Sequence, residues 1–349
     1  MTELPAPRPL IRRIRPQDAE AWRAVRLRAL LDAPDAFGST YDETVTRPAE
    51  EWTSSAARKT AGPAETLLLA FRGGQVVGLA GGFTAPEHPH ERILISMWVD
   101  PALRGSGLAR RLVHRICDWS TAAGANAVRL WVTETNDRAR ALYEACGFTP
   151  TGQREPLPSK PSLDEIEMRL DLATRAVVRR IRPDEAEVWR ATRLAALKDA
   201  PDAFGPTYED SAKLAPSYWG DRVARAASGE ELAVFAAVDR RGRWIGLAAG
   251  GSLGEAAGDA VSRHLGSVWV APEARGQQLV PRLLDALCDW AAEGGATRVL
   301  LDVTETNERA ISIYHRYGFQ LTGARHPLRP GSALDEVEMA LELEPPPTA

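Results

Sequence analysis

An internal repeat constrains this chain more than any other feature. Residues 11–43 recur without a gap as residues 178–210, with 23 of 33 positions identical. Farther along, residues 129–148 (RLWVTETNDRARALYEACGF) recur as residues 300–319 (LLDVTETNERAISIYHRYGF). Two matches of this length do not arise by chance, so a whole domain has been duplicated. Each copy is therefore a control for the other, because a residue kept in one copy and lost in its twin marks a difference in role.

Length and composition fit two ordinary domains. The 349 residues divide into copies at residues 10–172 and 177–344, which we call the first and the second lobe. The formal net charge of −4 gives no reason to expect a nucleic-acid partner. No apolar run approaches the roughly 18 residues that span a bilayer, so we expect no membrane partner. Three cysteines in a chain without a signal peptide favour a reducing, cytoplasmic location, and the six histidines lack metal-ligand spacing, so we expect no metal.

The predicted elements follow the same order in both lobes. Each lobe begins with a short strand, two helical segments and a hairpin, and continues with strands and helices in alternation. In the first lobe the patterns predict helices at Asp18–Leu31, Glu50–Lys59, Leu108–Ala123 and Asp137–Cys146, and strands at Leu10–Arg15, Thr66–Arg72, Gln75–Phe83, Ile93–Val99, Ala127–Thr133 and Leu163–Leu170. We expect Gln153–Ser162 to be a loop before the last strand. Mixed elements of this kind predict the α/β (α+β) class.

A glycine-containing loop at the start of a helix is the first feature that carries chemistry. The strand that ends at Val99 is broken by Pro101, and the sequence that follows opens an amphipathic helix. Glycines at positions 105 and 107 allow positive φ angles and keep Cβ atoms away from a ligand. The free N–H groups of the first helical turn then converge on an anion. The loop predicts a phosphate site formed by Arg104, Gly105, Ser106, Gly107, Leu108, Ala109 and Arg110. It matches neither the Walker A pattern nor the dinucleotide fingerprint.

A second motif lies downstream and predicts a helix beside this loop. Asn136 is a suitable N-cap for a helix that begins at Asp137. Ala139 and Tyr143 are four residues apart, so they share one face of that helix. The tyrosine can therefore point into the same crevice as the phosphate loop.

Together the two motifs resemble those of the GCN5-related N-acetyltransferases (GNAT), once per lobe and over essentially the whole chain. The resemblance rests on Arg-x-x-Gly-x-Ala followed by Asn-x-x-Ala-x-x-x-Tyr-x-x-x-Gly-Phe. It implies two tandem domains, each a mixed, mostly antiparallel sheet with splayed central strands flanked by helices. Acetyl-CoA would lie in the gap, with its pyrophosphate on residues 104–110 and its pantetheine arm along Met97, Trp98 and Val99.

The resemblance also implies direct acyl transfer to an amine. Such a reaction needs a neutral nucleophile, stabilisation of the oxyanion and a proton for the departing thiolate. Tyr143 matches the residue that commonly donates this proton, and the backbone N–H near Val99 would polarise the carbonyl. Glu134 is the best acidic candidate for the general base, although a structural role at the helix entry, a water-relayed base or an amine that arrives unprotonated would equally fit.

The two copies differ in the loop. In the second lobe Gln278 stands for Gly107, Val280 for Ala109 and Pro281 for Arg110. Proline removes one of the N–H donors but is tolerated in a first helical turn. The fold should survive while the anion site weakens, and we therefore expect catalysis in the first lobe. Whether the second lobe still holds CoA weakly stays open.

The sequence leaves the acceptor open. The leading hypothesis is acetylation of a small amine, with acetyl-CoA as co-substrate. Alternatives are N-terminal acetylation of proteins or peptides, acetylation of an amine in thiol-cofactor synthesis, and a non-catalytic CoA-binding or scaffolding role. Phe37 and Trp52 lie in the region where the family binds acceptors, but we expect both to be core residues because each recurs in the second lobe. Since a duplicated domain can satisfy its own pairing surface, we expect a monomer with pseudo-dimeric lobes.

Overall fold

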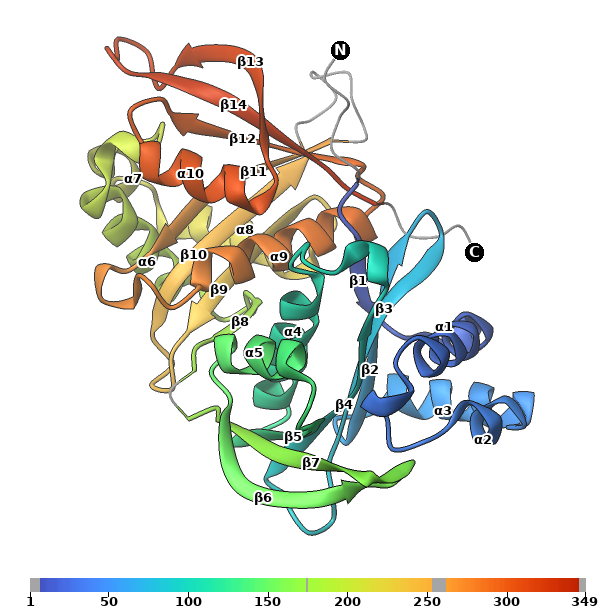
Figure 1. Ribbon diagram of the computed structural model, residues 1–349. Coiled ribbons are helices and arrows are strands. Elements are labelled where there is room, and N and C mark those ends of the chain that lie inside the picture. Colours follow the sequence, from blue (N-terminus) through green and yellow to red (C-terminus); the bar gives the residue numbers. More distant parts are fainter. Residues whose placement is uncertain (1–6, 174, 253–261, 345–349) are drawn as a thin grey trace. The chain divides into compact units, whose positions relative to one another are not determined.

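A computed structural model describes residues 7–173, 175–252 and 262–344 (Figure 1). The chain divides into two compact units. Among the described residues, 11–175 form one unit, and 176–344 form the other together with 7–10. These units are described separately below, under the names first lobe and second lobe.

The first lobe is built on a seven-stranded mixed sheet in the order β1-β2-β3-β4-β5-β7-β6. Its helices are α1 (Ala19–Asp32), α2 (Tyr41–Val45), α3 (Ala49–Ala61), α4 (Leu108–Ala122) and α5 (Asp137–Ala145), and its strands are β1 (Leu10–Arg13), β2 (Glu65–Arg72), β3 (Gln75–Phe83), β4 (Glu91–Val99), β5 (Ala127–Thr133), β6 (Thr149–Leu157) and β7 (Lys160–Asp171). Strands β4 and β5 run parallel, whereas β2–β3, β3–β4, β5–β7 and β6–β7 are antiparallel.

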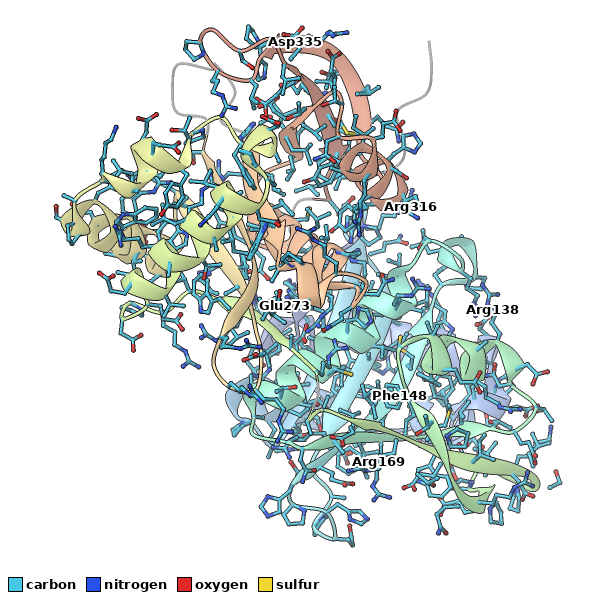
Figure 2. The ribbon with its side chains drawn as sticks, turned by 90° about the vertical axis from the view of Figure 1, so that its left-hand side faces the viewer. Arg138, Phe148, Arg169, Glu273, Arg316 and Asp335 are labelled. Atoms are coloured by element: carbon cyan, nitrogen blue, oxygen red, sulfur yellow. The ribbon has the colours of Figure 1, made fainter. Side chains whose placement is uncertain are left out.

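Each face of this sheet carries its own layer of helices (Figure 1). Leu112 and Ile116 of α4 pack with Leu130 of β5, and Tyr143 of α5 joins the same core cluster. On the opposite face, α1 and α3 cover β2 and β3 through a separate cluster. Phe148, labelled in Figure 2, closes the first of these clusters directly after α5. The alternation of side chains along each strand thus assigns its residues either to the α4 face or to the α1 face.

The second lobe repeats this architecture. Its sheet has the order β13-β14-β12-β11-β10-β9-β8, and its β11 and β12 are the parallel pair. The helices are α6 (Ala186–Asp199), α7 (Tyr208–Ala212), α8 (Pro216–Ser228), α9 (Leu279–Glu293) and α10 (Glu308–Tyr317), and the strands are β8 (Val177–Arg180), β9 (Leu232–Val238), β10 (Trp244–Ser252), β11 (Ser262–Val270), β12 (Arg298–Thr304), β13 (Gln320–Pro327) and β14 (Asp335–Glu342).

The predicted fold class and the splayed, mostly antiparallel sheets are confirmed, but one local prediction is wrong. Residues 149–157 form strand β6, so most of the segment Gln153–Ser162 is not a loop. Every residue of β6 except Leu157 is exposed, because this strand lies at the edge of the sheet. Its glycine and two prolines, tolerated at an edge, hide the strand pattern in the sequence.

A membrane-spanning helix and a cluster of metal ligands are both absent from the described residues. None of the helices in the described ranges is long and apolar enough to cross a membrane. Over the same ranges, no three His, Cys, Asp or Glu side chains are grouped so as to hold a metal ion. Cys117 and Cys288 are buried in α4 and α9.

Candidate active site

The site begins where β4 separates from β5. The two strands pair only from Glu91 to Ile93, and beyond that point β4 remains paired with β3 alone. Ser96, in the half of β4 that is not paired with β5, has a φ angle of 56°, and the β3–β4 register shifts beside it. A non-glycine residue with positive φ is strained and often marks a functional position. The backbone of Met97, Trp98 and Val99 therefore faces a gap between the central strands.

The loop after β4 forms an open cradle of backbone donors. Gly105 and Gly107 have φ angles of 93° and 85°, and Gly107 is the left-handed N-cap of α4. A Cβ atom built on either glycine meets nothing within 4 Å. Ser106 Oγ donates to the carbonyl of Leu103, which holds the loop in place. The loop is exposed, and the first turn of α4, including Ala109 and Arg110, opens from it.

The side chain of Arg104 holds the loop against the ends of α1 and β4. Its guanidinium pairs with Asp32 at the end of α1, and its Nε donates to the carbonyl of Val99 at 3.1 Å. Asp32 also accepts a hydrogen bond from Trp98 Nε1 at 2.8 Å. One carboxylate thus fixes both the end of β4 and the start of the loop. The side chain of Arg104 is committed to this clamp, and its backbone N–H donates to the carbonyl of Pro101 at 3.2 Å, so Arg104 contributes by positioning the loop.

Tyr143 is buried beside the same gap. It is 6% exposed and packs edge-on against Phe148, with ring centroids 5.9 Å apart. Its core cluster also contains Val99 and Leu108, with Met97, Ala109 and Ala139 packed against it. Burial raises the pKa of Tyr143 well above its ordinary value. The phenol therefore stays protonated through the neutral range, as a proton donor requires.

Helix α5 is fixed by the predicted cap. The side chain of Asn136 accepts a hydrogen bond from the backbone N–H of Ala139 at 3.1 Å. This bond satisfies one of the free donors of the first turn and sets where α5 begins. The position of Tyr143 follows from that start, one turn beyond Ala139.

Two carboxylates compete for the role of base. Glu134 follows β5 directly, but it is half-exposed and forms an ion pair with Arg154 of β6. Glu165 on β7 is only 8% exposed and lies opposite Thr133 in the β5–β7 ladder. Directly paired residues project to the same face, and Thr133 donates to the carbonyl of Asp35, in the loop after α1, at 2.5 Å. Glu165 therefore faces the α1 side of the sheet.

The environment of Glu165 suits a base better than that of Glu134. Burial, and secondarily the neighbouring Glu155, raise the pKa of Glu165 above its ordinary value. Local sequence motifs did not point to Glu165. The signal was the alternation Glu165, Glu167, Arg169 on one face of β7, where the fold class leads one to expect apolar side chains.

The second lobe keeps the scaffold and changes the cradle. Asp199 clamps Trp269 and Arg275 as Asp32 clamps their twins, and Tyr314 packs on Phe319 at 5.9 Å. The N-cap of α9 is Gln278, with a φ angle of 57°. A glutamine side chain thus stands at the left-handed position that glycine occupies in the first lobe, and Pro281 removes a donor from the first turn.

The sequence matches the model of the acetyltransferase (GNAT) family twice, over residues 28–148 and 194–319. These stretches together cover well over half of the chain. The chain therefore belongs to the GNAT acetyltransferase family, with one copy in each lobe. Enzymes of this family transfer an acetyl group, and acetyl-CoA is their donor.

The chain is also similar to curated proteins and to solved structures. A mycothiol acetyltransferase of Beutenbergia cavernae is 32% identical over 133 residues, which are 38% of this chain and 42% of that protein. One from Thermobifida fusca is 30% identical over 70% of this chain and 76% of its own length. The N-alpha-acetyltransferase RimI of Mycobacterium tuberculosis is 35% identical over 33% of this chain and 71% of its own. A GNAT-family structure from Streptococcus pneumoniae covers 47% of this chain and 99% of its own, with 23% identity and a TM-score of 0.43. Several of these matches span about two fifths of the relative's length.

The first lobe fits acetyl-CoA by its own geometry. A cradle in which a Cβ atom would enter open space suits a pyrophosphate, and the half-paired strand β4 leaves backbone groups for an extended arm. The buried tyrosine shares a core cluster with Val99 of β4 and Leu108 of α4. In the second lobe the glutamine and the proline oppose the same fit.

Proposed function

We propose that this chain transfers the acetyl group of acetyl-CoA to the primary amine of a small molecule, and that the reaction takes place in the first lobe. The observation that carries the proposal is the contrast between two loops on one scaffold. Gly107 has no side chain at the N-terminus of α4, whereas Gln278 carries one at the N-terminus of α9 and Pro281 lacks an N–H donor in its first turn. We take residues 10–172 and 177–344 as the two domains, of which the first is catalytic.

Each candidate residue has a physical role in this proposal. Residues 104–110 bind the pyrophosphate through backbone N–H groups, and Met97, Trp98 and Val99 present the edge of β4 to the pantetheine arm. Asn136 and Ala139 set the start of α5, and Tyr143 gives its proton to the departing thiolate. The bound donor supplies an activated thioester, and the chain supplies orientation, polarisation and protons.

The base is assigned to Glu165, with Glu134 as the competing candidate. A base must lose its proton and then accept one from the amine, so a raised pKa near the working pH is favourable. Burial raises the pKa of Glu165 above its ordinary value, which makes its carboxylate a stronger proton acceptor. Glu134 is half-exposed and paired with Arg154, so its carboxylate is already engaged by another side chain.

A second candidate function is acetylation of an amine in thiol-cofactor synthesis. It is favoured by the match to the Thermobifida fusca mycothiol acetyltransferase, which extends over 70% of this chain and therefore includes both lobes. The two candidates share the chemistry and differ in the acceptor.

The test is a screen of amines with the full chain and acetyl-CoA, in which mass spectrometry detects acetylated product. Product formation that slows strongly in Tyr143→Phe supports the proposal. If CoA binds and no amine among small molecules, thiol-cofactor precursors and peptides is acetylated, the chain is a CoA-binding module and the proposal is wrong.

A further inference from the structure

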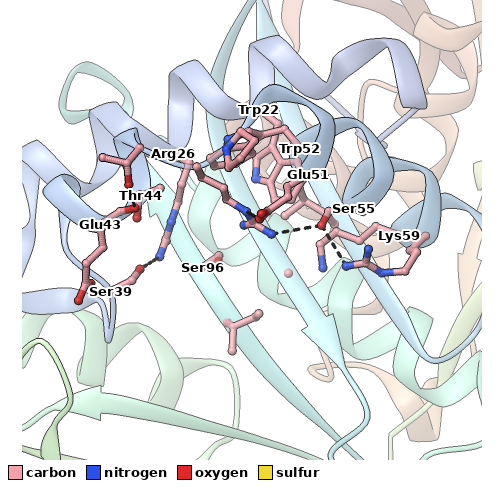
Figure 3. Close-up of a pocket in the computed structure, with 17 residues that line it drawn as sticks. Trp22, Arg26, Ser39, Glu43, Thr44, Glu51, Trp52, Ser55, Lys59 and Ser96 are labelled. Atoms are coloured by element: carbon pink, nitrogen blue, oxygen red, sulfur yellow. Dashed lines mark hydrogen bonds and ion pairs between the residues drawn. The ribbon is translucent and has the colours of Figure 1, made fainter.

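A pocket of about 500 Å³ lies on the α1 face of the first lobe (Figure 3). Its floor is formed by Gly81 of β3 and by Ile95 and Ser96 of β4. Trp22 of α1 and Trp52 of α3 stack edge-on beside it, with ring centroids 4.8 Å apart. Because Ser96 is the strained residue beside the gap, the pocket opens at the place where β4 leaves β5.

Basic side chains dominate the lining. Arg26, Arg47, Arg58 and Lys59 line the pocket together with two carboxylates, Glu43 and Glu51. Glu43 is occupied in the cap of α2, where it accepts the backbone N–H of Thr40. Glu51 pairs with Arg47 at 2.9 Å. With Glu65, which pairs with Arg58 and Lys59, four cations lie beside three carboxylates, so the pocket carries a small excess of positive charge.

Two of these cations converge on one hydroxyl. Ser55 is buried and accepts hydrogen bonds from Arg47 at 3.3 Å and from Arg58 at 3.0 Å (Figure 3). Arg58 also shares Glu65 with Lys59. Like charges brought together at a neutral group raise the local positive potential, which attracts an anion.

Arg26 has no acidic partner among the described residues. Its Nη2 donates to Ser39 Oγ at 2.8 Å, its guanidinium stacks on the ring of Phe37 at 4.4 Å, and its buried Nη1 has no hydrogen-bond partner there. Burial lowers the pKa of Arg26 to about 10, which reflects a charge without compensation. A guanidinium held this way is preorganised to bind a carboxylate or a phosphate.

We propose that this pocket binds the acceptor, and that the acceptor is an amine with an anionic group, a carboxylate or a phosphate, which Arg26 recognises. The inference rests on the proposed function, since it names the substrate class for the same site. The amine would lie near Ser96 and the anionic group between α1 and α3. Amines that carry only positive charge, such as polyamines, would be disfavoured by the same field.

The second lobe supports the assignment by contrast. Arg193 repeats Arg26 and stacks on Phe204 at 4.4 Å, with a buried Nη1 that likewise has no partner among the described residues. However, Ser39, Arg47 and Lys59 are replaced there by Pro206, Leu214 and Ala226. The hydroxyl that orients the arginine and two of the cations are thus present only in the lobe with the open loop.

The test compares matched acceptors with the full chain and acetyl-CoA. One series contains ω-amino carboxylic acids of increasing length and their amides, and a second pair is phosphoethanolamine and ethanolamine. We expect kcat/KM for the best anionic member to exceed that of its neutral partner by about tenfold or more, because a charge-assisted bidentate contact is lost in the neutral one. Spermidine should be a poor acceptor. Equal rates for acids and amides, or a preference for spermidine, would overturn the inference.

Variants test whether this pocket causes the preference for anionic acceptors. Arg26→Gln should abolish it, and Arg26→Lys should restore part of it. The matched control, Arg193→Gln, should leave it unchanged. If Arg193→Gln abolishes the preference and Arg26→Gln does not, the assignment to this pocket is wrong. Thermal unfolding shows whether each variant folds. If Arg26→Gln does not fold, the preference of the unaltered chain for anionic over neutral acceptors still tests the inference.

A binding measurement separates this inference from the proposed function. The N-acetylated ω-amino acids and their amides cannot react further, so calorimetry with them is independent of catalysis. If they bind with dependence on charge and on Arg26 while no amine is acetylated, the pocket assignment holds and the proposed function fails. If amines are acetylated without any effect of charge or of Arg26, the function holds and this inference is overturned.

Discussion

The two lobes have one fold, and they differ at several positions where we propose that a ligand binds. Both keep the aspartate clamp, the capped helix and its tyrosine. The differences lie in the loops before α4 and α9 and in the lining of the pocket over β4. There the second lobe has other residues in place of Gly107, Ser39 and Arg47. Residues that hold the fold together are thus retained in both copies, as are Tyr143 and Arg26, whereas Gly107, Ser39 and Arg47 are present in the first copy alone. The predictions below test that division.

The largest effect is expected from the tyrosines. Tyr143→Phe should lower kcat for acetyl transfer by about 10³-fold, within the range of general acid catalysis. Tyr314→Phe should leave kcat unchanged, although Tyr314 is equally buried and its pKa is raised in the same way. Steady-state kinetics on the full chain measure both. Equal losses from the two variants would show that both lobes catalyse, and a loss from Tyr314→Phe alone would reverse the assignment.

The carboxylates on β7 and β14 give the next comparison. Glu165→Gln should lower kcat/KM about 100-fold and remove the acidic limb of its pH profile. In the unaltered chain kcat/KM should rise with pH through the raised pKa of Glu165, since the base acts only when deprotonated. Glu336→Gln, its twin, and Glu134→Gln should keep the profile. A profile lost in Glu134→Gln would make Glu134 the base.

Stability gives Glu165 an independent readout. A carboxyl whose pKa is raised in the folded state favours folding while it is protonated, and that contribution is lost as the pH rises through the raised pKa. At neutral pH the buried charge therefore works against the fold. Glu165→Gln should keep or increase the Tm at pH 7 while it removes activity, whereas a merely structural residue would lose both.

The loops should differ in affinity for acetyl-CoA. Gly107→Gln should weaken binding by about 10- to 100-fold, because the side chain enters the cradle and displaces charge-assisted hydrogen bonds. The variant should fold, since Gln278 already occupies the same left-handed position in the second lobe. The converse double variant, Gln278→Gly with Pro281→Arg, should create a second binding event. Calorimetry counts the sites, and an unchanged affinity in Gly107→Gln would refute the pyrophosphate assignment.

The sequence predicted the fold well because its signals are local. The hairpin at Gly73-Gly74, the Asn136 cap and the apolar spacing of α4 depend on nearby residues, and the observed bounds of β3 and β5 coincide with the predicted ones. Strand β6 was missed because it is held as a strand by its pairing with β7, and its own residues do not show a strand pattern. Glu165 and the pocket over β4 were missed for a related reason. Their burial and their clustered charges arise only when α1, α3, β4 and β7 come together in the fold.

The smallest effect tests the shared scaffold. Asn136→Ala and Asn307→Ala each remove a side-chain acceptor for a backbone N–H, Ala139 and Ala310 respectively, at 3.1 Å in both lobes. Each should cost about 1 kcal/mol of unfolding free energy, the usual value of an N-cap. Denaturant unfolding measures this cost. Only Asn136→Ala should also reduce acetyl transfer, because α5 carries the working tyrosine. Equal stability losses with unequal activity losses would separate scaffold from chemistry within one pair of residues, and equal activity losses would contradict the division between the lobes.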